Sequence, residues 1–315
     1  MATSNSINFT TTRDELIKDA FKKINVLGTY EALADEDLQL AARQLNRMIK
    51  AWQIDGIYVW TQREAIIFLR DDVQSYTLGS GGTGDHASDI TNVVKTTLSA
   101  AEAADQTVLS MTKTTGMAVS DNIGIELDDV TRQWTTISAL TSTTVTVATA
   151  LTSAASAENT VYTYRTKMNR PLRIVSARLE DENGDDRPVT IFSRQEYFDL
   201  VQKDNSSNVS YVYYDAGLTD TGTLYVWPTS DNVKRKLRIT YARTLEDFDA
   251  ATNNPDLPTE WYDAIVYNLA VRISHDFRVR SEDIKDVTGM AGYLYTQLKA
   301  SAQEPEPIVF QPDFS

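Results

Sequence analysis

The stretch Gly79–Gly84 reads GSGGTG and matches G-x-G-x-x-G, the pattern of a dinucleotide-binding loop between a strand and a helix. The residues that follow it decide between an α/β fold and a fold rich in antiparallel strands. They read DHASDITNVVKTTLSAAEAADQTV, with β-branched side chains crowded at residues 90–97. Such side chains favour strands, because a helix restricts their χ1 rotation. We therefore predict no dinucleotide site here and no cofactor.

A P-loop is also excluded, since no Lys-Ser or Lys-Thr pair closes the glycines. Glycine and serine without an anchoring helix are typical of a flexible connection. We predict that the run is a linker, with hinge residues Gly79, Gly81, Gly82 and Gly84.

The linker opens a segment of different composition, rich in Thr, Ser, Ala and Val from about residue 107 to residue 164. Five strand candidates recur in it between turn residues: TVLSM, NIGIELD, QWTTISAL, TTVTVATAL and NTVYTYR. Short strands at this spacing indicate a small antiparallel barrel or sandwich. Surface loops tolerate such insertions, so we predict that residues 85–167 form an inserted all-β domain.

Two amphipathic helices precede the glycine run. The first begins at Arg13 behind a capping box made by Thr12 and Glu15, and the second begins near Asp35. The second helix also carries three basic residues at helical spacing on a separate face: Arg43, Arg47 and Lys50. This face is either a docking surface for an acidic partner or an ordinary solvated helix face.

The chain after the insert has alternating strand patterns followed by two helical stripes. Asn183-Gly184, between two strand-like arms, predicts a hairpin turn. Asp181, Asn183 and Asp185 also suggest calcium ligation, but glycine and glutamate are absent from the places that an EF-hand requires. We therefore favour the turn.

The predicted fold is α+β, a helical bundle with an antiparallel β-meander plus the inserted all-β barrel or sandwich. Residues 1–84 and 168–302 form the two parts of the host domain, and residues 85–167 form the insert. Residues 303–315 contain three prolines, which exclude a helix or a central strand. The apolar residues of this tail dock on a partner or belong to a frayed terminus: Ile308, Val309, Phe310 and Phe314.

Composition limits the chemistry that the chain can perform. Cysteine is absent from the 315 residues, and the two histidines, His86 and His275, have no spacing of a metal or catalytic pair. No serine-hydrolase elbow or zinc-protease motif occurs, although a carboxylate pair could lie among the 44 acidic residues. We predict no metal site and no enzyme. The sequence also predicts no secretory signal and no membrane span.

The formal net charge is −14, which disfavours a sequence-specific DNA-binding protein. An acidic surface remains compatible with DNA that slides past it without sticking. The simplest interpretation of the charge is solubility.

The host segments resemble a known family. RDELIKDAFKKINVLG, ALADEDLQLAARQLNRMIKAW, GTLYVWPTSDNVKRKLRITYARTLEDF and LPTEWYDAIVYNLA are similar to the head-to-tail adaptor of short-tailed bacteriophages. The resemblance covers residues 13–78 and about 170–300, and residues 85–167 depart from the shortest family members, which have only a loop there. It implies a structural virion protein at the head–tail interface, made in the host cytoplasm.

The resemblance further implies a twelve-subunit ring below the portal protein, which extends the DNA channel and carries the tail nozzle, other tail proteins and fibres. The C-terminal tail would then insert against the portal, while double-stranded DNA passes through the lumen. Two alternatives remain open: a tail-associated peptidoglycan hydrolase, and a carbohydrate-binding protein that uses the β-rich insert.

Overall fold

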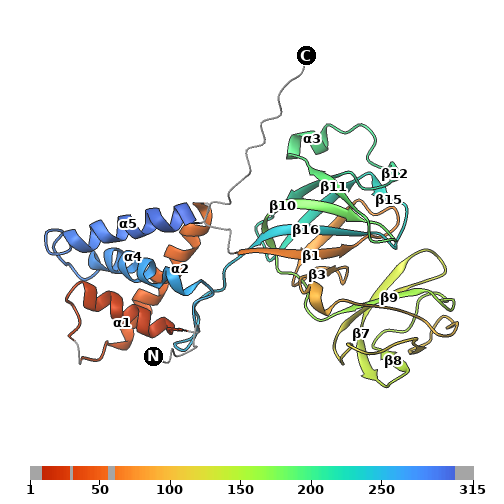
Figure 1. Cartoon of the computed structure of the whole chain (residues 1–315), viewed down its shortest axis with the longest axis horizontal. Helices are drawn as coiled ribbons and strands as arrows, with labels where there is room; N and C mark the ends of the chain where they lie inside the picture. The colour runs from red at the N-terminus through yellow and green to blue at the C-terminus, as the bar shows by residue number, and fades with distance from the viewer. Residues whose placement is uncertain (1–8, 29–30, 56–60, 302–315) are drawn as a thin grey trace, which may run out of the picture. The chain divides into compact units, whose positions relative to one another are not determined.

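The computed structural model describes residues 9–28, 31–55 and 61–301 (Figure 1). The chain divides into two compact units, one made of Met1–Thr61 with Leu245–Ser315 and the other of Gln62–Thr244. Strands make up 31% of the chain and helices 26%, so the α+β class is confirmed. The domain boundaries predicted at 84/85 and 167/168 both fall inside the second unit and stay a prediction.

The first unit contains the helices that enclose one hydrophobic core. Their buried stripes follow the predicted spacing, as in Leu16, Ile17, Ala20 and Phe21 of the first helix. The capping box of Thr12 and Glu15 is confirmed. The bounds are α1 (Arg13–Lys23), α2 (Asp35–Ile54), η3 (Thr259–Trp261), α4 (Tyr262–Ser274) and α5 (Lys285–Ser301).

The second unit contains an eight-stranded sheet with the order β2-β14-β13-β11-β10-β16-β1-β3. Its strands come from both sides of the predicted insert, because β1 pairs with β16 along its full length. The bounds are β1 (Gln62–Phe68), β2 (Ser75–Gly79), β3 (His86–Ala87), β10 (Pro171–Glu180), β11 (Asp186–Ile191), β13 (Tyr211–Asp215), β14 (Thr221–Trp227) and β16 (Lys236–Arg243).

This sheet corrects the prediction of a simple antiparallel meander. The hairpin at Asn183-Gly184 is confirmed, since β10 and β11 pair antiparallel on either side of it. However, β11 and β13 pair parallel, because residues 192–210 cross over between them. That crossover holds α3 (Arg194–Phe198) and β12 (Ser206–Ser207), and β12 pairs with β15 (Thr229–Ser230). The capping box of Ser193 and Glu196 starts α3.

A six-stranded sheet with the order β4-β9-β6-β7-β8-β5 also belongs to the second unit. The five strand candidates of the Thr-rich segment are all confirmed as strands of this sheet. One face buries an aliphatic core that includes Ile123, Ile125 and Val161. The bounds are η2 (Ile90–Asn92), β4 (Val94–Thr97), β5 (Val108–Ser110), β6 (Asn122–Glu126), β7 (Arg132–Leu140), β8 (Thr144–Val147) and β9 (Thr160–Tyr164).

Replacing Ile265 by alanine tests whether α4 anchors the helical core. Ile265 is fully buried among the helices. We expect Ile265→Ala to lower the free energy of unfolding by about 2–5 kcal/mol, through lost burial and the cavity left behind. Urea unfolding followed by far-UV circular dichroism measures this change. Ile54→Ala, at an exposed position of α2, is the control and should shift stability by no more than about 0.5 kcal/mol. Equal effects would contradict the assignment.

Candidate interaction surfaces

The glycine run forms a closely packed turn between β2 and β3. The N–H of Gly82 donates to the carbonyl of Gly79 at 2.9 Å. A Cβ atom on Gly82 would lie 2.1 Å from the carbonyl oxygen of Thr77, and one on Gly84 would lie 2.9 Å from Cβ of Trp134. Close approach of neighbouring backbone and side chains therefore requires glycine at these two positions.

Protein donors occupy the carbonyl oxygens of this turn. The ring Nε2–H of His86 donates to the carbonyl of Gly79 at 3.0 Å. Lys167 Nζ donates to the carbonyl of Gly82 at 3.1 Å, and the hydroxyl of Tyr164 donates to the carbonyl of Gly84 at 2.8 Å. Tyr164 and Lys167 belong to the segment that leads out of the six-stranded sheet. The run thus connects the two sheets by hydrogen bonds, and its hinge role stays a prediction.

Buried Asp85 holds the turn from the other side. Its Oδ2 lies 3.1 Å from Nε of Arg70, and the hydroxyl of Thr83 donates to its Oδ1 at 2.5 Å. His86 Nδ1 lies 3.4 Å from the same Oδ1. His86 therefore has a structural role, while His275 ends α4 at an exposed position.

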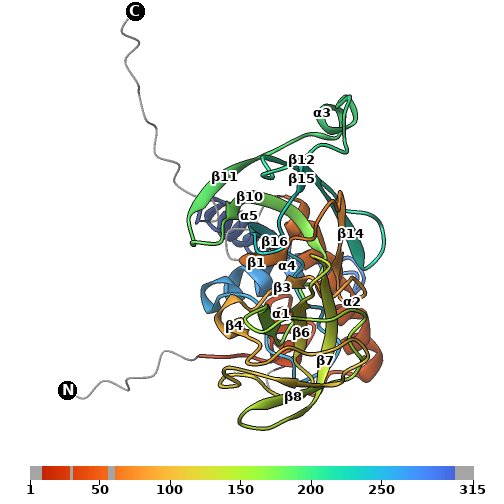
Figure 2. The ribbon, with the colours of Figure 1, turned by 90° about the vertical axis from the view of Figure 1, so that its right-hand side faces the viewer.

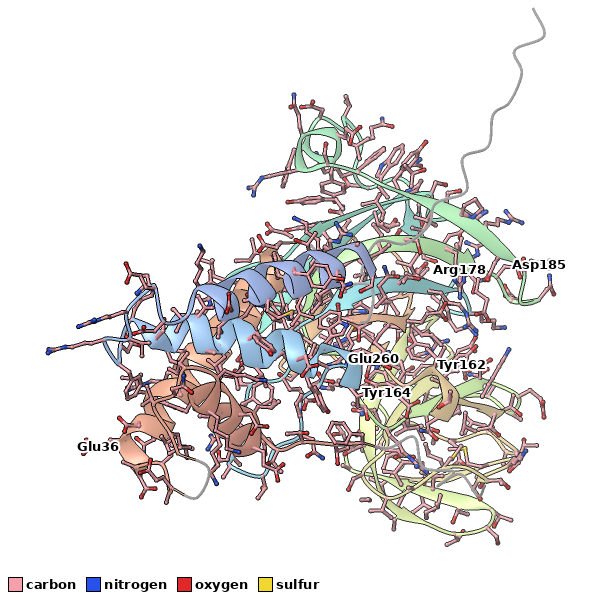
Figure 3. The ribbon with its side chains drawn as sticks, turned by 60° about the vertical axis from the view of Figure 1, so that its left-hand side comes forward. Glu36, Tyr162, Tyr164, Arg178, Asp185 and Glu260 are labelled. Carbon is pink, nitrogen blue, oxygen red and sulfur yellow. The ribbon has the colours of Figure 1, made fainter. Side chains whose placement is uncertain are left out.

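An aromatic layer joins the two sheets. Phe68 of β1 contacts Trp134 and Tyr162 at ring-centroid distances of 4.9 and 5.0 Å, and Tyr164 at 6.1 Å. Tyr162 and Tyr164 are labelled in Figure 3. Burial raises the pKa of both tyrosine hydroxyls, so they stay protonated as neutral donors. The layer depends on strand alternation, which places residues 132 and 134 of β7 on one face.

Arg132 lies in this layer with only 4% of its surface exposed. Its guanidinium carbon is 4.9 Å from the ring centroid of Tyr162, and Lys236 Nζ is 5.4 Å from the same centroid. The three guanidinium nitrogens of Arg132 donate no hydrogen bond to any of the described residues. Burial lowers the pKa of Arg132. Sequence reasoning missed this residue, although its alternation with Trp134 was a usable signal.

The basic face of α2 divides into two kinds of residue. Lys50 Nζ donates to the carbonyl of Leu245 at 2.8 Å and pairs with Asp247 at 2.9 Å, which fixes the chain after β16. Arg43 and Arg47 are exposed on the same helix. Arg43 and Arg47 are therefore the two basic residues of this face that reach solvent freely, while Lys50 makes contacts inside its own unit.

The remaining predicted sites fall in two places. Ile308, Val309, Phe310 and Phe314 lie outside the described residues. At the hairpin, Oδ1 of Asp181 accepts hydrogen bonds from the N–H groups of Asn183 and Asp185 at 2.8 and 3.0 Å, and these backbone hydrogen bonds lower the pKa of Asp181.

The described part of the chain contains no group of three or more acidic or histidine side chains arranged to hold a metal ion. No helix in the same part is both long and apolar enough to cross a membrane.

The described chain thus combines two packed units with exposed apolar and basic positions at their surfaces. A family model described as SU10 adaptor protein matches residues 87–305, and the chain belongs to this family. It is a family of bacteriophage structural adaptors and not a known enzyme family. No curated protein sequence matches the chain.

The matched range includes the whole six-stranded sheet, β4 to β9, together with the strands and helices that follow it. The resemblance of residues 13–78 lies before the matched range and stays a prediction.

Alanine substitutions within the glycine run separate a packed turn from a free linker. We expect Gly82→Ala to lower the free energy of unfolding by about 1–3 kcal/mol, because its Cβ would meet the backbone of Thr77. Gly81→Ala is the matched control, since its Cβ would meet only Thr221 Cγ2 at 3.7 Å. Thermal unfolding of the two variants measures the difference. Equal tolerance of both would indicate a turn without tight packing.

Replacing Arg132 by methionine tests the cost of its burial. Apolar side chains of similar volume often replace buried charges without loss, so we expect the free energy of unfolding to be unchanged or raised by up to about 4 kcal/mol. Arg178→Met is the comparison, because Arg178 pairs with Glu64 at 3.0 Å and Asp186 at 2.9 Å and is partly exposed. That variant should lose about 1 kcal/mol or less. A clear destabilisation by Arg132→Met would mean that the guanidinium has an acceptor in solution.

Proposed function

We propose that the chain forms the head-to-tail adaptor ring of a short-tailed bacteriophage. In this proposal twelve copies bind below the portal protein, extend the DNA channel and present a platform for the tail nozzle, other tail proteins and fibres. The observation that carries the proposal is the match of the SU10 adaptor family over more than half of the chain. The protein then resides in the virion at the head–tail interface.

The charge of the chain supports a channel role. A net charge of −14 repels DNA phosphates on average, so double-stranded DNA would pass the lumen with little adhesion. The six-stranded sheet would be a peripheral platform that faces away from the channel, where it contacts fibres or neighbouring subunits. The exposed residues Arg43 and Arg47 and the apolar tail residues 308–314 would provide contacts with the portal.

The division into two units fits such a role. Each unit has its own hydrophobic core, and the chain passes between them at residues 61/62 and 244/245. Both crossings leave the same end of the β1–β16 ladder, where Gln62 pairs with Ala242. A subunit built from two firm bodies has separate surfaces to offer to the portal, to its neighbours and to later tail proteins.

Single-particle imaging of the purified protein, alone and mixed with the portal of the same phage, tests this function. We expect rings of twelve subunits that attach below the portal. A chain that ends at Ser301 is the matched variant: it keeps the described fold and should lose affinity for the portal. Wild-type particles that stay monomeric and do not bind the portal would contradict the proposal. A zymogram for peptidoglycan cleavage would then be the next measurement.

A further inference from the structure

The short helix α3 and the residues after it form an exposed apolar tip on the second unit. We call Arg194, Phe198 and Val201 the α3 tip. Phe198 is 50% exposed and Val201 is 97% exposed. Figure 2 shows α3 standing at the outer end of the eight-stranded sheet, away from the six-stranded sheet.

The α3 tip is held firmly although it is exposed. On its inner side Tyr197 packs on Tyr213 and Tyr225, at ring-centroid distances of 5.7 and 5.1 Å. The N–H of Ser193 donates to Oε2 of Glu196 at 2.7 Å and closes the capping box. Lys203 Nζ donates to the carbonyls of Phe198 and Leu200 at 3.1 and 2.9 Å, which fixes the loop that carries Val201. Apolar side chains that face solvent on a hydrogen-bonded backbone are typical of a protein contact, since the ordering entropy of that backbone is already lost before binding.

Arg194 adds a positive charge to the α3 tip. Its side chain is 71% exposed, and its Nη1 forms an ion pair with Oδ2 of Asp215 at 3.8 Å. Its guanidinium carbon is 5.4 Å from the ring centroid of Phe198. The tip therefore presents an apolar knob with an arginine beside it, on a chain that is acidic overall.

A groove on the first unit has the complementary character. It has a volume of about 400 Å³ and lies between the start of α4 and the end of α5. Its lining includes the buried residues Trp261, Ala264 and Leu298 and the exposed Glu260, which is labelled in Figure 3. The groove is completed by Leu294, Gln297 and Ser301.

We propose that the α3 tip of one copy docks into the α4–α5 groove of a second copy, with Arg194 facing Glu260. This inference rests on the proposed ring and names its subunit contact. An apolar knob with an arginine meets an apolar groove with a glutamate, so the two surfaces match in apolar character and in charge. The two surfaces belong to different units, so the contact is heterologous, and such contacts close into rings when the rotation permits.

A charge exchange tests the pairing. Arg194→Glu and Glu260→Arg should each weaken self-association, measured by sedimentation velocity with and without the portal, because like charges then face each other. The double variant restores the pair in every copy and should recover assembly. All three variants should melt like the wild type, because Arg194 and Glu260 are exposed and a surface ion pair contributes little to folding.

Phe198→Ser tests the apolar part of the contact and should weaken self-association about ten-fold or more. Leu218→Ser, at an exposed apolar position outside the α3 tip, is the matched control and should assemble like the wild type. If rings form normally with both Phe198→Ser and Arg194→Glu, the inference is wrong while the proposed function stands. If the wild type itself neither forms rings nor binds the portal, the proposed function fails first.

The groove has one other candidate occupant, residues 302–315, which begin directly after Ser301. A chain that ends at Ser301 separates the two cases. If this truncation alone abolishes self-association and Phe198→Ser has no effect, the tail fills the groove and the docking of the α3 tip is overturned. If the truncated chain still assembles and remains sensitive to Phe198→Ser, the docking of the tip is supported.

Discussion

The contact of Phe68 with the aromatic face of β7 and β9 is the interaction on which the second unit depends. Phe68 belongs to the eight-stranded sheet, whereas Trp134, Tyr162 and Tyr164 belong to the six-stranded sheet. Stacking these large rings removes apolar surface from water on both sheets at once. The tight turn at Gly82 and Gly84 follows from the contact, because the chain must pass from β2 to β3 within a space that Trp134 and His86 already fill.

The same layer explains the polar groups that lie beside it. Tyr164 and Lys167 satisfy carbonyls of the glycine turn, so its burial leaves these acceptors paired. Asp85 is compensated by Arg70 and Thr83. Arg132 is the exception: its charge is set against the ring of Tyr162, an interaction weaker than a hydrogen-bonded ion pair. The junction between the sheets thus combines extensive apolar contact with one buried charge, that of Arg132, whose desolvation lowers the stability of the fold.

The chain belongs to the SU10 adaptor family, so its exposed surfaces are the part of the structure to examine for partner contacts. In an assembly protein the exposed surfaces carry the function, and the packed interior serves to hold them in place. The α3 tip and the α4–α5 groove both present apolar side chains, and they lie on different units. The range of the family match spans the six-stranded sheet and the strands and helices that follow it.

Local patterns in the sequence by themselves determined the helices, the strands and their caps. The capping boxes at Thr12 and Ser193, the hairpin at Asn183-Gly184 and the five strands of the Thr-rich segment depend on residues a few positions apart. The β-branched residues after the glycine run likewise predicted strand, and β4 lies there.

Only the tertiary structure decided which strands are neighbours, and which residues contact the glycine run and the charged side chains. The parallel pairing of β11 with β13 depends on a crossover whose route no local pattern fixes. Gly84 is constrained by Trp134, 50 positions away, and Lys50 is bound to Leu245 and Asp247, 195 or more positions away along the chain. Contacts of this kind arise from packing between distant segments, so neither composition nor spacing predicts them.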